Sequence, residues 1–186
     1  MSDTLAPAPV IAVVGPSGVG KDSVMEALVA RQAGYRIQRR VITRPEEAGG
    51  EAFTGVDLVA FERIEAAGGF ALSWRAHGLA YGIPAGIEGL RAGAQGVLVN
   101  LSRGVLTEAQ ARFPGLIVLS LTADPEVLAQ RLAERGREDA EDRARRLTRA
   151  AAPLPEGLHR VVTLDNSGAL EATVTAALAL LQPESA

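Results

Sequence analysis

A single lysine inside a glycine-rich segment is the residue whose surroundings point most directly to chemistry. Residues 15–22 read Gly-Pro-Ser-Gly-Val-Gly-Lys-Asp, after a short apolar run and before a helical apolar pattern. Such glycines let backbone N–H groups converge on a phosphate, while the lysine reaches the β and γ oxygens of a nucleoside triphosphate. The segment predicts a P-loop for ATP with Lys21 as a catalytic residue. The residues expected to bind ATP here are Gly15, Pro16, Ser17, Gly18, Val19, Gly20, Lys21, Asp22 and Ser23.

The P-loop pattern normally has Ser or Thr at the position of Asp22, where the hydroxyl binds Mg²⁺. A carboxylate is a hard oxygen ligand that holds Mg²⁺ directly or through water, and Ser23 offers an alternative hydroxyl. Both residues are therefore candidates for a magnesium site. The alternative role of Asp22 is that of a negative charge in the first helical turn, where it interacts favourably with the helix dipole.

Arginines supply 18 of the 19 basic residues, and they are dense between residues 131 and 149. During transfer of a γ-phosphoryl group, charge spreads over its oxygens, and guanidinium groups that arrive with a closing lid stabilise it. Gly136 provides a flexible point, so a lid is predicted at about 135–142. The alternative is a solvated helix that pairs arginines with nearby acidic residues, which we expect for Arg143 and Arg145.

Short apolar runs alternate with helical patterns along the chain. Strands are predicted at 10–14, 40–43, 70–74, 96–100, 116–121 and 160–164, and helices at about 22–31, 57–67, 85–93, 104–112, 125–135, 139–151 and 168–181. This alternation is typical of an α/β fold, with a mostly parallel sheet covered by helices on both faces and ligands at the carboxyl ends of its strands.

The domain organisation expected from the same patterns is a single domain over 10–181, with tails at 1–9 and 182–186. The glycine-rich acidic segment 46–55 and the segment 136–142 are predicted to be mobile. Each is either a loop that closes over phosphates or a plain surface connection.

Composition excludes several classes of site. The chain has no Cys and only two His, which excludes disulfides, thiolate nucleophiles and cysteine-bound zinc. A net charge of −3 argues against a general nucleic-acid binder. No apolar run approaches the roughly 18 residues of a membrane span, and the amino terminus lacks a signal-peptide pattern. We expect a cytoplasmic protein with no nucleic-acid or membrane partner; the sequence does not indicate its oligomeric state.

A series of motifs runs in order along almost the whole chain. They are Gly-Pro-Ser-Gly-x-Gly-Lys-Asp-Ser at 15–23, Ile-Thr-Arg-Pro at 42–45, Ala-Leu-Ser-Trp at 71–74, Tyr-Gly at 81–82, Leu-Val-Asn-x-Ser-Arg at 98–103, and arginine-rich stretches at 131–138 and 146–150. This series resembles the ribose 1,5-bisphosphate phosphokinases, enzymes of bacterial phosphonate breakdown. In that family the Gly-Lys-Asp-Ser form of the P-loop is itself expected.

The resemblance implies a guanylate-kinase-like P-loop kinase fold of three layers with a mobile lid. It also implies an activity, the transfer of the γ-phosphoryl group of ATP to the 1-phosphate of ribose 1,5-bisphosphate, with Mg²⁺ as cofactor. The products are 5-phosphoribosyl 1-diphosphate and ADP. A phosphate acceptor is already ionised near neutral pH, which fits a sequence without a convincing general base.

Guanylate kinase is the near alternative to this family assignment. By the resemblance, Arg44 matches its GMP-phosphate arginine, Tyr81 its phosphate-contacting tyrosine, and Arg135 and Arg146 its lid and catalytic arginines. The positions that bind guanine in that enzyme differ in this sequence. Leu72 stands where guanylate kinase has a glutamate, and Ile83 stands where it has a threonine. Asn100 and Ser102 lie in the stretch where it has two aspartates. A pocket without polar readers discriminates strongly against guanine.

The remaining site residues are assigned to the acceptor or to adenine. The substrate-binding region is expected at about 36–83. The residues expected to bind substrate, within this region and beyond it, are Arg44, Ser73, Tyr81, Asn100, Ser102, Arg103, Arg137 and Arg149. Asn166 is expected on the adenine side of ATP. His77 is either a phosphate donor or an ordinary loop histidine. Asp165 ends a run that resembles a Walker B strand, but a helix-capping or structural role is expected for it.

Two other functions remain open. One is a nucleoside-monophosphate kinase or another small-phosphometabolite kinase on the same scaffold. The other is a non-catalytic interaction module of the guanylate-kinase type. An intact Lys21, a complete glycine loop and the lid arginines argue against the module, because a domain without catalysis has no need of all three.

Overall fold

The computed structural model describes residues 7–45, 52–134 and 152–182. The elements are β1 (Val10–Val14), α1 (Lys21–Arg31), β2 (Tyr35–Gln38), β3 (Val41–Ile42), β4 (Thr54–Gly55), α2 (Leu58–Ala66), β5 (Phe70–Ala76), β6 (Leu79–Pro84), α3 (Ile87–Arg91), β7 (Gly96–Asn100), the short 3₁₀ helix η2 (Arg103–Val105), α4 (Leu106–Arg112), β8 (Ile117–Thr122), α5 (Pro125–Glu134), β9 (Val161–Asp165) and α7 (Leu170–Leu181). The predicted helix at 139–151 and the predicted lid lie outside the described residues.

A five-stranded parallel sheet forms the centre of the molecule. Its order is β2-β7-β1-β8-β9, and every pair in it is parallel. The Val-Ile-Ala-Val-Val sequence of β1 is buried along its whole length, as a central strand covered on both faces requires. Because β2, β7 and β1 are neighbours, their carboxyl ends meet at one edge of the sheet, next to the glycine-rich turn.

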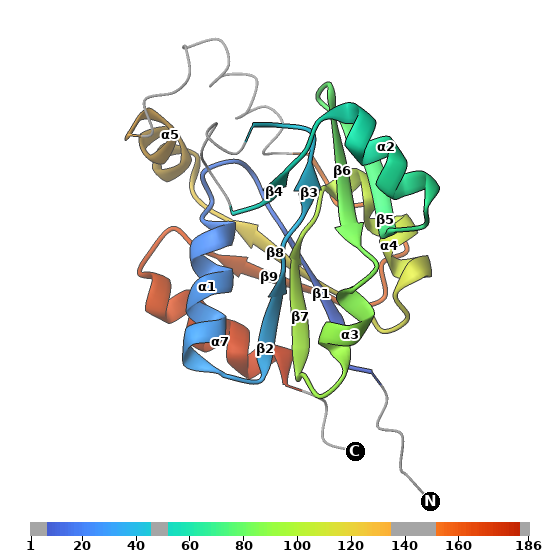
Figure 1. Cartoon of the computed structure of the whole chain (residues 1–186). Coiled ribbons are helices and arrows are strands. Elements are labelled where there is room, and N and C mark those ends of the chain that lie inside the picture. Colours follow the sequence, from blue (N-terminus) through green and yellow to red (C-terminus); the bar gives the residue numbers. More distant parts are fainter. Residues whose placement is uncertain (1–6, 46–51, 135–151, 183–186) are drawn as a thin grey trace, which may run out of the picture.

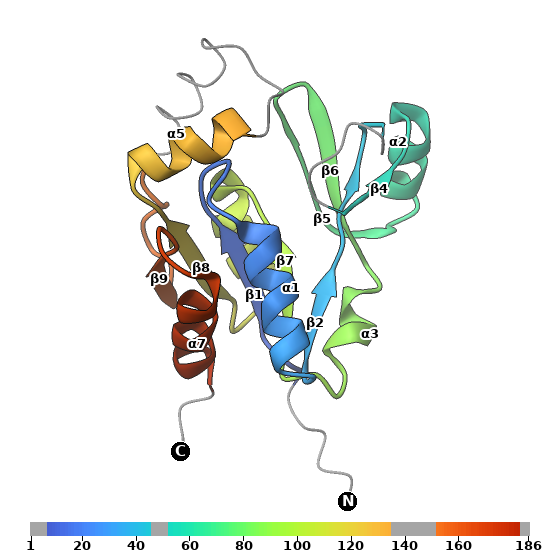
Figure 2. The ribbon, with the colours of Figure 1, turned by 90° about the vertical axis from the view of Figure 1, so that its left-hand side faces the viewer.

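Helices cover both faces of this sheet, as predicted, and give three layers. Alternate residues of β1 divide between two cores: Ile11 and Val13 pack with α1 and α7, whereas Val10 and Ala12 pack with α3 and α4. Figure 1 shows α1 and α7 to the left of the sheet and α3 and α4 to its right. Figure 2 shows α5 across the end of the sheet that carries the glycine-rich turn.

A second sheet of four strands, β4-β3-β6-β5, stands above the edge formed by β2 and β7 (Figure 2). Its outer face is covered by α2, where the Phe61 ring packs at a tilt against the Phe70 ring, with centroids 4.6 Å apart. The strands predicted at 40–43 and 70–74 belong to this sheet. Their expected place in the parallel sheet was therefore wrong, because β3 and β5 both pair antiparallel with β6.

Two strands that the sequence did not predict explain this difference. β2 continues almost directly into β3, so the chain passes from one sheet to the other over only two residues, Arg39 and Arg40. β6 contains Gly82 and ends at Pro84, residues that weaken a strand signal. A side chain at Gly82 would collide with the Phe70 ring, which packs across it.

The β5–β6 hairpin closes through a two-residue turn, His77-Gly78, with φ of 53° and 74°. Positive φ at both positions is the signature of the tight hairpin turn that matches strand twist. His77 is exposed there, which fits the ordinary loop histidine rather than the phosphate donor.

Of the segment 46–55, residues 52–55 are described, and they hold buried Phe53 and strand β4. Across the described ranges, no helix is both long and apolar enough to cross a membrane.

Candidate active site

The turn between β1 and α1 has the geometry of a phosphate cradle. Gly18 and Gly20 have φ of 84° and 94°, in the region that favours glycine. A side chain on Gly15 would lie 2.6 Å from the Leu121 carbonyl oxygen, so the turn packs directly on β8. Gly20 is the N-cap of α1, and no side chain caps that end. The helix therefore presents backbone N–H groups and its positive dipole end to a ligand.

Lys21 lies across this turn. Its Nζ donates to the carbonyl oxygens of Gly15 at 3.0 Å and Pro16 at 3.2 Å. Two such bonds hold the ammonium group over the loop that would surround the phosphates. A compact ammonium makes this approach, whereas a planar guanidinium has a different shape and donor geometry.

The P-loop is supported from the far end of the chain. The Val19 carbonyl oxygen accepts from Asn166 Nδ2 at 2.7 Å and from Arg131 Nη1 at 3.4 Å. Asn166 is only 4% exposed, and its Oδ1 accepts from Thr173 Oγ1 at 2.7 Å. The structure thus places Asn166, predicted to contact ATP, against the P-loop backbone, where it positions the loop.

Asp165 has a structural role here. Its Oδ1 accepts from Ser167 N at 2.9 Å and Ser167 Oγ at 2.6 Å, which closes a local turn. These two bonds, with a smaller contribution from the charge of Arg131, hold the pKa of Asp165 below its ordinary value. The residue does not cap α7, whose N-cap is Ala169.

A cavity of about 190 Å³ opens beside the P-loop, where the chain crosses between the two sheets. Its polar and charged lining residues are Asp22, Glu26, Gln38, Arg39, Arg40 and Asn100. They come from α1, from the crossing after β2, and from the carboxyl end of β7. This is the edge of a parallel sheet where ligands are expected.

The two candidate magnesium ligands differ in position. Asp22 is half-buried and lines the cavity, directly after Lys21, whereas Ser23 is exposed and does not line it. The carboxylate of Asp22 could therefore hold a divalent metal that is bound together with ATP. No cluster of three or more acidic or histidine side chains suited to a metal occurs in the described part of the chain. Phosphate oxygens and water would supply the other ligands, as is usual for Mg²⁺ in kinases.

The second sheet presents an aromatic wall, Trp74 and Tyr81, to the apolar core that it shares with the parallel sheet. Trp74 and Tyr81 are cross-strand neighbours on β5 and β6, and their rings stack 5.2 Å apart at an angle of 7°. Trp74 Nε1 donates to Ser102 Oγ at 3.2 Å, which ties the wall to the loop after β7. The fold thus brings together Tyr81 and Ser102, predicted separately as acceptor residues.

Two of the predicted arginines have defined partners. The Arg44 guanidinium carbon lies 4.4 Å from the centroid of the Phe53 ring. Arg103 Nη1 donates to the Ala152 carbonyl oxygen at 2.7 Å, and burial lowers its pKa.

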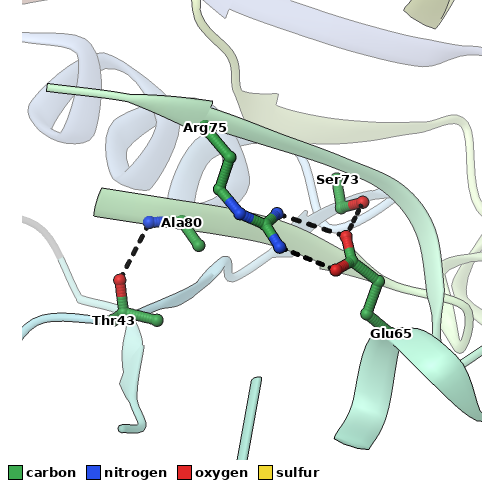
Figure 3. A network of polar contacts seen from close by, with 5 residues as sticks. All are labelled: Thr43, Glu65, Ser73, Arg75 and Ala80. Atoms are coloured by element: carbon green, nitrogen blue, oxygen red, sulfur yellow. Dashed lines mark hydrogen bonds and ion pairs between the residues drawn. The ribbon is translucent and has the colours of Figure 1, made fainter. Parts of the chain in front are cut away.

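Ser73 points toward Glu65 of α2, on the face of the second sheet that this helix covers (Figure 3). Its hydroxyl donates to Glu65 Oε1 at 2.6 Å, and Arg75 forms an ion pair with the same carboxylate at 2.7 Å. Side chains alternate along a strand, so Ser73 and Trp74 point to opposite faces. The prediction that Ser73 binds substrate is therefore not supported by its position.

Arg40 and Trp74 were not predicted as site residues. With 18 arginines in the chain, no local feature distinguished Arg40. The predicted roles of Arg135, Arg137, Arg146 and Arg149 fall outside the described residues and stay predictions.

The two positions compared with the guanine readers, Leu72 and Ile83, face each other across β5 and β6. They are 4% and 0% exposed and belong to the apolar core. Neither position therefore presents a polar group that could hydrogen-bond to a base.

No family model matches the chain. A ribose 1,5-bisphosphate phosphokinase of Ruegeria sp. (strain TM1040) is 58% identical over 181 residues, which cover 97% of this chain and 95% of that protein. The chain belongs to the ribose 1,5-bisphosphate phosphokinase family. Another protein of that name, from Azotobacter vinelandii, is 48% identical over 92% of this chain and 94% of its own length.

Among solved structures, a guanylate kinase from Anaplasma phagocytophilum superposes with a TM-score of 0.67 at 16% identity, covering 95% of this chain and 85% of that one. At this identity the match concerns the fold, and it confirms the guanylate-kinase-like P-loop architecture of this ribose 1,5-bisphosphate phosphokinase family member.

Proposed function

We propose that the protein transfers the γ-phosphoryl group of ATP to the 1-phosphate of ribose 1,5-bisphosphate, forming 5-phosphoribosyl 1-diphosphate and ADP. The observation that carries this proposal is the pairing of an intact P-loop with an adjacent polar cavity. That cavity holds Asn100 and two arginines, while Leu72 and Ile83 leave the guanine-reading positions apolar. The names of the family relatives support the same substrate.

The reaction forms a bond between an oxygen of the acceptor 1-phosphate and the γ-phosphorus, and it breaks the bond to the oxygen shared with the β-phosphate. The attacking oxygen is already ionised, so no side chain has to remove a proton. Catalysis then consists of positioning and charge stabilisation. Lys21 and the N–H groups of the P-loop supply both on the donor side.

Magnesium bound with ATP would neutralise charge on the transferring phosphoryl group. We assign Asp22 as the side chain that holds it, directly or through water, and Ser23 as a weaker candidate. The remaining proposed roles are acceptor binding by Arg44, Tyr81, Asn100, Ser102, Arg103, Arg137 and Arg149, with Arg135 and Arg146 as catalytic arginines of the lid. We also propose that the enzyme works in the cytoplasm, from its lack of cysteine.

The test is ADP release with a panel of acceptors, followed by the mass of each product. We expect turnover of ribose 1,5-bisphosphate to a product heavier by one phosphoryl group, and little or no turnover of GMP or ribose 5-phosphate. Turnover of GMP without ribose 1,5-bisphosphate would instead establish a nucleotide kinase. Absence of both turnover and ATP binding would favour an interaction module.

A further inference from the structure

Arg40 occupies an unusual place, the short crossing where the chain leaves the parallel sheet and enters the second one. β2 ends at Gln38 and β3 begins at Val41. The backbone is fixed here, because the Arg40 carbonyl oxygen accepts from Thr54 N at 2.9 Å. The crossing also forms one wall of the cavity beside the P-loop.

The Arg40 side chain is buried and orientated by aromatic rings. It is 8% exposed, whereas Arg39 beside it is exposed. Its guanidinium carbon lies 5.1 Å from the Tyr81 ring centroid and 6.0 Å from that of Trp74. These rings are themselves stacked, so the guanidinium, Tyr81 and Trp74 form one group at the acceptor end of the site. Contact with an aromatic face fixes the plane of a guanidinium and therefore the directions in which its N–H groups point.

Two walls of the cavity carry opposite charges. Asp22 and Glu26 of α1 line the side nearest the P-loop, and Arg39 and Arg40 line the side formed by the crossing. An anionic group is therefore repelled by the α1 wall unless a metal is present, and it is attracted by the crossing. A planar guanidinium in a largely dry position is well suited to a phosphate, which it binds through two parallel hydrogen bonds.

The proposed acceptor carries two phosphates. The reacting one must meet ATP at the P-loop, and the resemblance to guanylate kinases gives it Arg44. The other phosphate needs a cation that a nucleoside monophosphate does not require. Resting on the proposed function, we infer that Arg40 binds the 5-phosphate of the acceptor and thereby selects a bisphosphorylated sugar.

The experiment compares two acceptors, ribose 1,5-bisphosphate and ribose 1-phosphate, with two proteins, the wild type and Arg40→Gln. Binding of the 5-phosphate by Arg40 predicts that the wild type prefers the bisphosphate by roughly 100-fold or more in kcat/KM, as expected for loss of a buried charged contact. In Arg40→Gln we expect that preference to fall by about the same factor, with kcat/KM for ribose 1-phosphate and KM for ATP unchanged. Arg36→Gln, an exposed arginine of β2, provides the control with the same change of charge and should behave as wild type.

Equal losses on both acceptors would overturn the inference, because Arg40 would then contact the reacting phosphate or only support the fold. An unchanged preference would overturn it as well. If Arg40→Gln does not fold, Arg40→Lys is compared instead, with a loss of at least about 10-fold expected on the bisphosphate alone. Failure of the wild type to use ribose 1,5-bisphosphate at all would contradict the proposed function itself, which separates the two outcomes.

Discussion

The proposed donor and acceptor sides of this site are built in different ways. The donor side is one continuous segment, the P-loop, whose glycines, lysine and following helix are adjacent in the sequence. The acceptor side combines the crossing after β2, the β5–β6 hairpin and the loop after β7, which are separated by tens of residues. The two sides meet at the carboxyl edge of the parallel sheet.

This difference should determine how substitutions on each side affect the reaction. A continuous P-loop depends on its own backbone conformation, on its packing against β8, and on the bonds from Asn166 and Arg131 to the Val19 carbonyl oxygen. The proposed acceptor side depends on how strands of the second sheet are orientated, because the face on which a residue lies decides whether it can reach the site. Ser73, for example, lies on the face covered by α2. We expect substitutions on the donor side to disable the reaction and substitutions on the acceptor side to change which substrate is used.

The largest effect is expected for Lys21→Arg. The charge is kept, but a planar guanidinium cannot occupy the space of an ammonium that contacts the carbonyl oxygens of Gly15 and Pro16. We expect kcat to fall by roughly 100- to 1,000-fold with an unchanged thermal unfolding midpoint. Steady-state kinetics and calorimetry measure the two. Near-normal kcat would contradict the role of Lys21 from which the donor side is derived.

Gly20→Ala is expected to damage the same side through the backbone. Its φ of 94° disfavours any side chain, and the new Cβ would lie 2.9 Å from Asn166 Nδ2. We expect the free energy of unfolding to fall by about 1–3 kcal/mol and ATP affinity to weaken, as measured by denaturant titration and calorimetric binding. Gly89→Ala, in α3 with open space around it, is the control and should not destabilise the protein.

Thr173→Val tests the support of the P-loop. The variant removes the donor to Asn166 Oδ1, which is buried, and so costs about 1–3 kcal/mol of stability. Because Asn166 then holds the Val19 carbonyl less firmly, we expect KM for ATP to rise by a few-fold, with KM for the acceptor unchanged. Thr175→Val on the exposed side of α7 is the matched control. A loss of stability without a change in KM for ATP would limit Thr173 to packing.

The smallest effect is expected for Ser73→Ala. The hydroxyl contacts Glu65 on the face covered by α2, so both KM values should change by less than about two-fold. A large rise in KM for the acceptor would show instead that Ser73 reaches the substrate.

The Ser73→Ala variant should also change how the stability of the protein depends on pH. Hydrogen bonds from Arg75 and Ser73 hold the pKa of Glu65 below its ordinary value. A lowered folded-state pKa contributes stability above the unfolded-state pKa, and this contribution is lost as pH falls through the folded value. Removal of the Ser73 hydroxyl should move the pKa of Glu65 upward, so the loss should begin at a higher pH. An NMR titration of the Glu65 carboxyl group measures this, and an unchanged pKa would indicate that Arg75 alone sets it.

Much of the donor side was predictable because its signals are local. The apolar run of β1, the glycine spacing and the start of α1 follow one another, and each has a physical meaning without knowledge of distant residues. The order of helices and most strands followed from the same periodicities. The family could be recognised for the same reason, since its motifs are short and contiguous.

The second sheet was not predictable in this way. β4 is two residues long and β6 contains a glycine, so neither stands out as a strand. Without β6, nothing in the sequence states that β5 pairs antiparallel with it, or which face of β5 carries Ser73 and which carries Trp74. Register and sheet membership arise from contacts between distant segments, and a shift of one residue exchanges the two faces.

The sequence by itself determined the chemistry of this protein. It placed one lysine in a glycine loop ahead of a helix, and local backbone geometry makes that arrangement a phosphate site wherever the rest of the chain lies. Only the tertiary structure decided the acceptor side, because the burial of Arg40 against Tyr81 and Trp74 and the placement of Asn166 behind Val19 depend on packing between segments far apart in the chain.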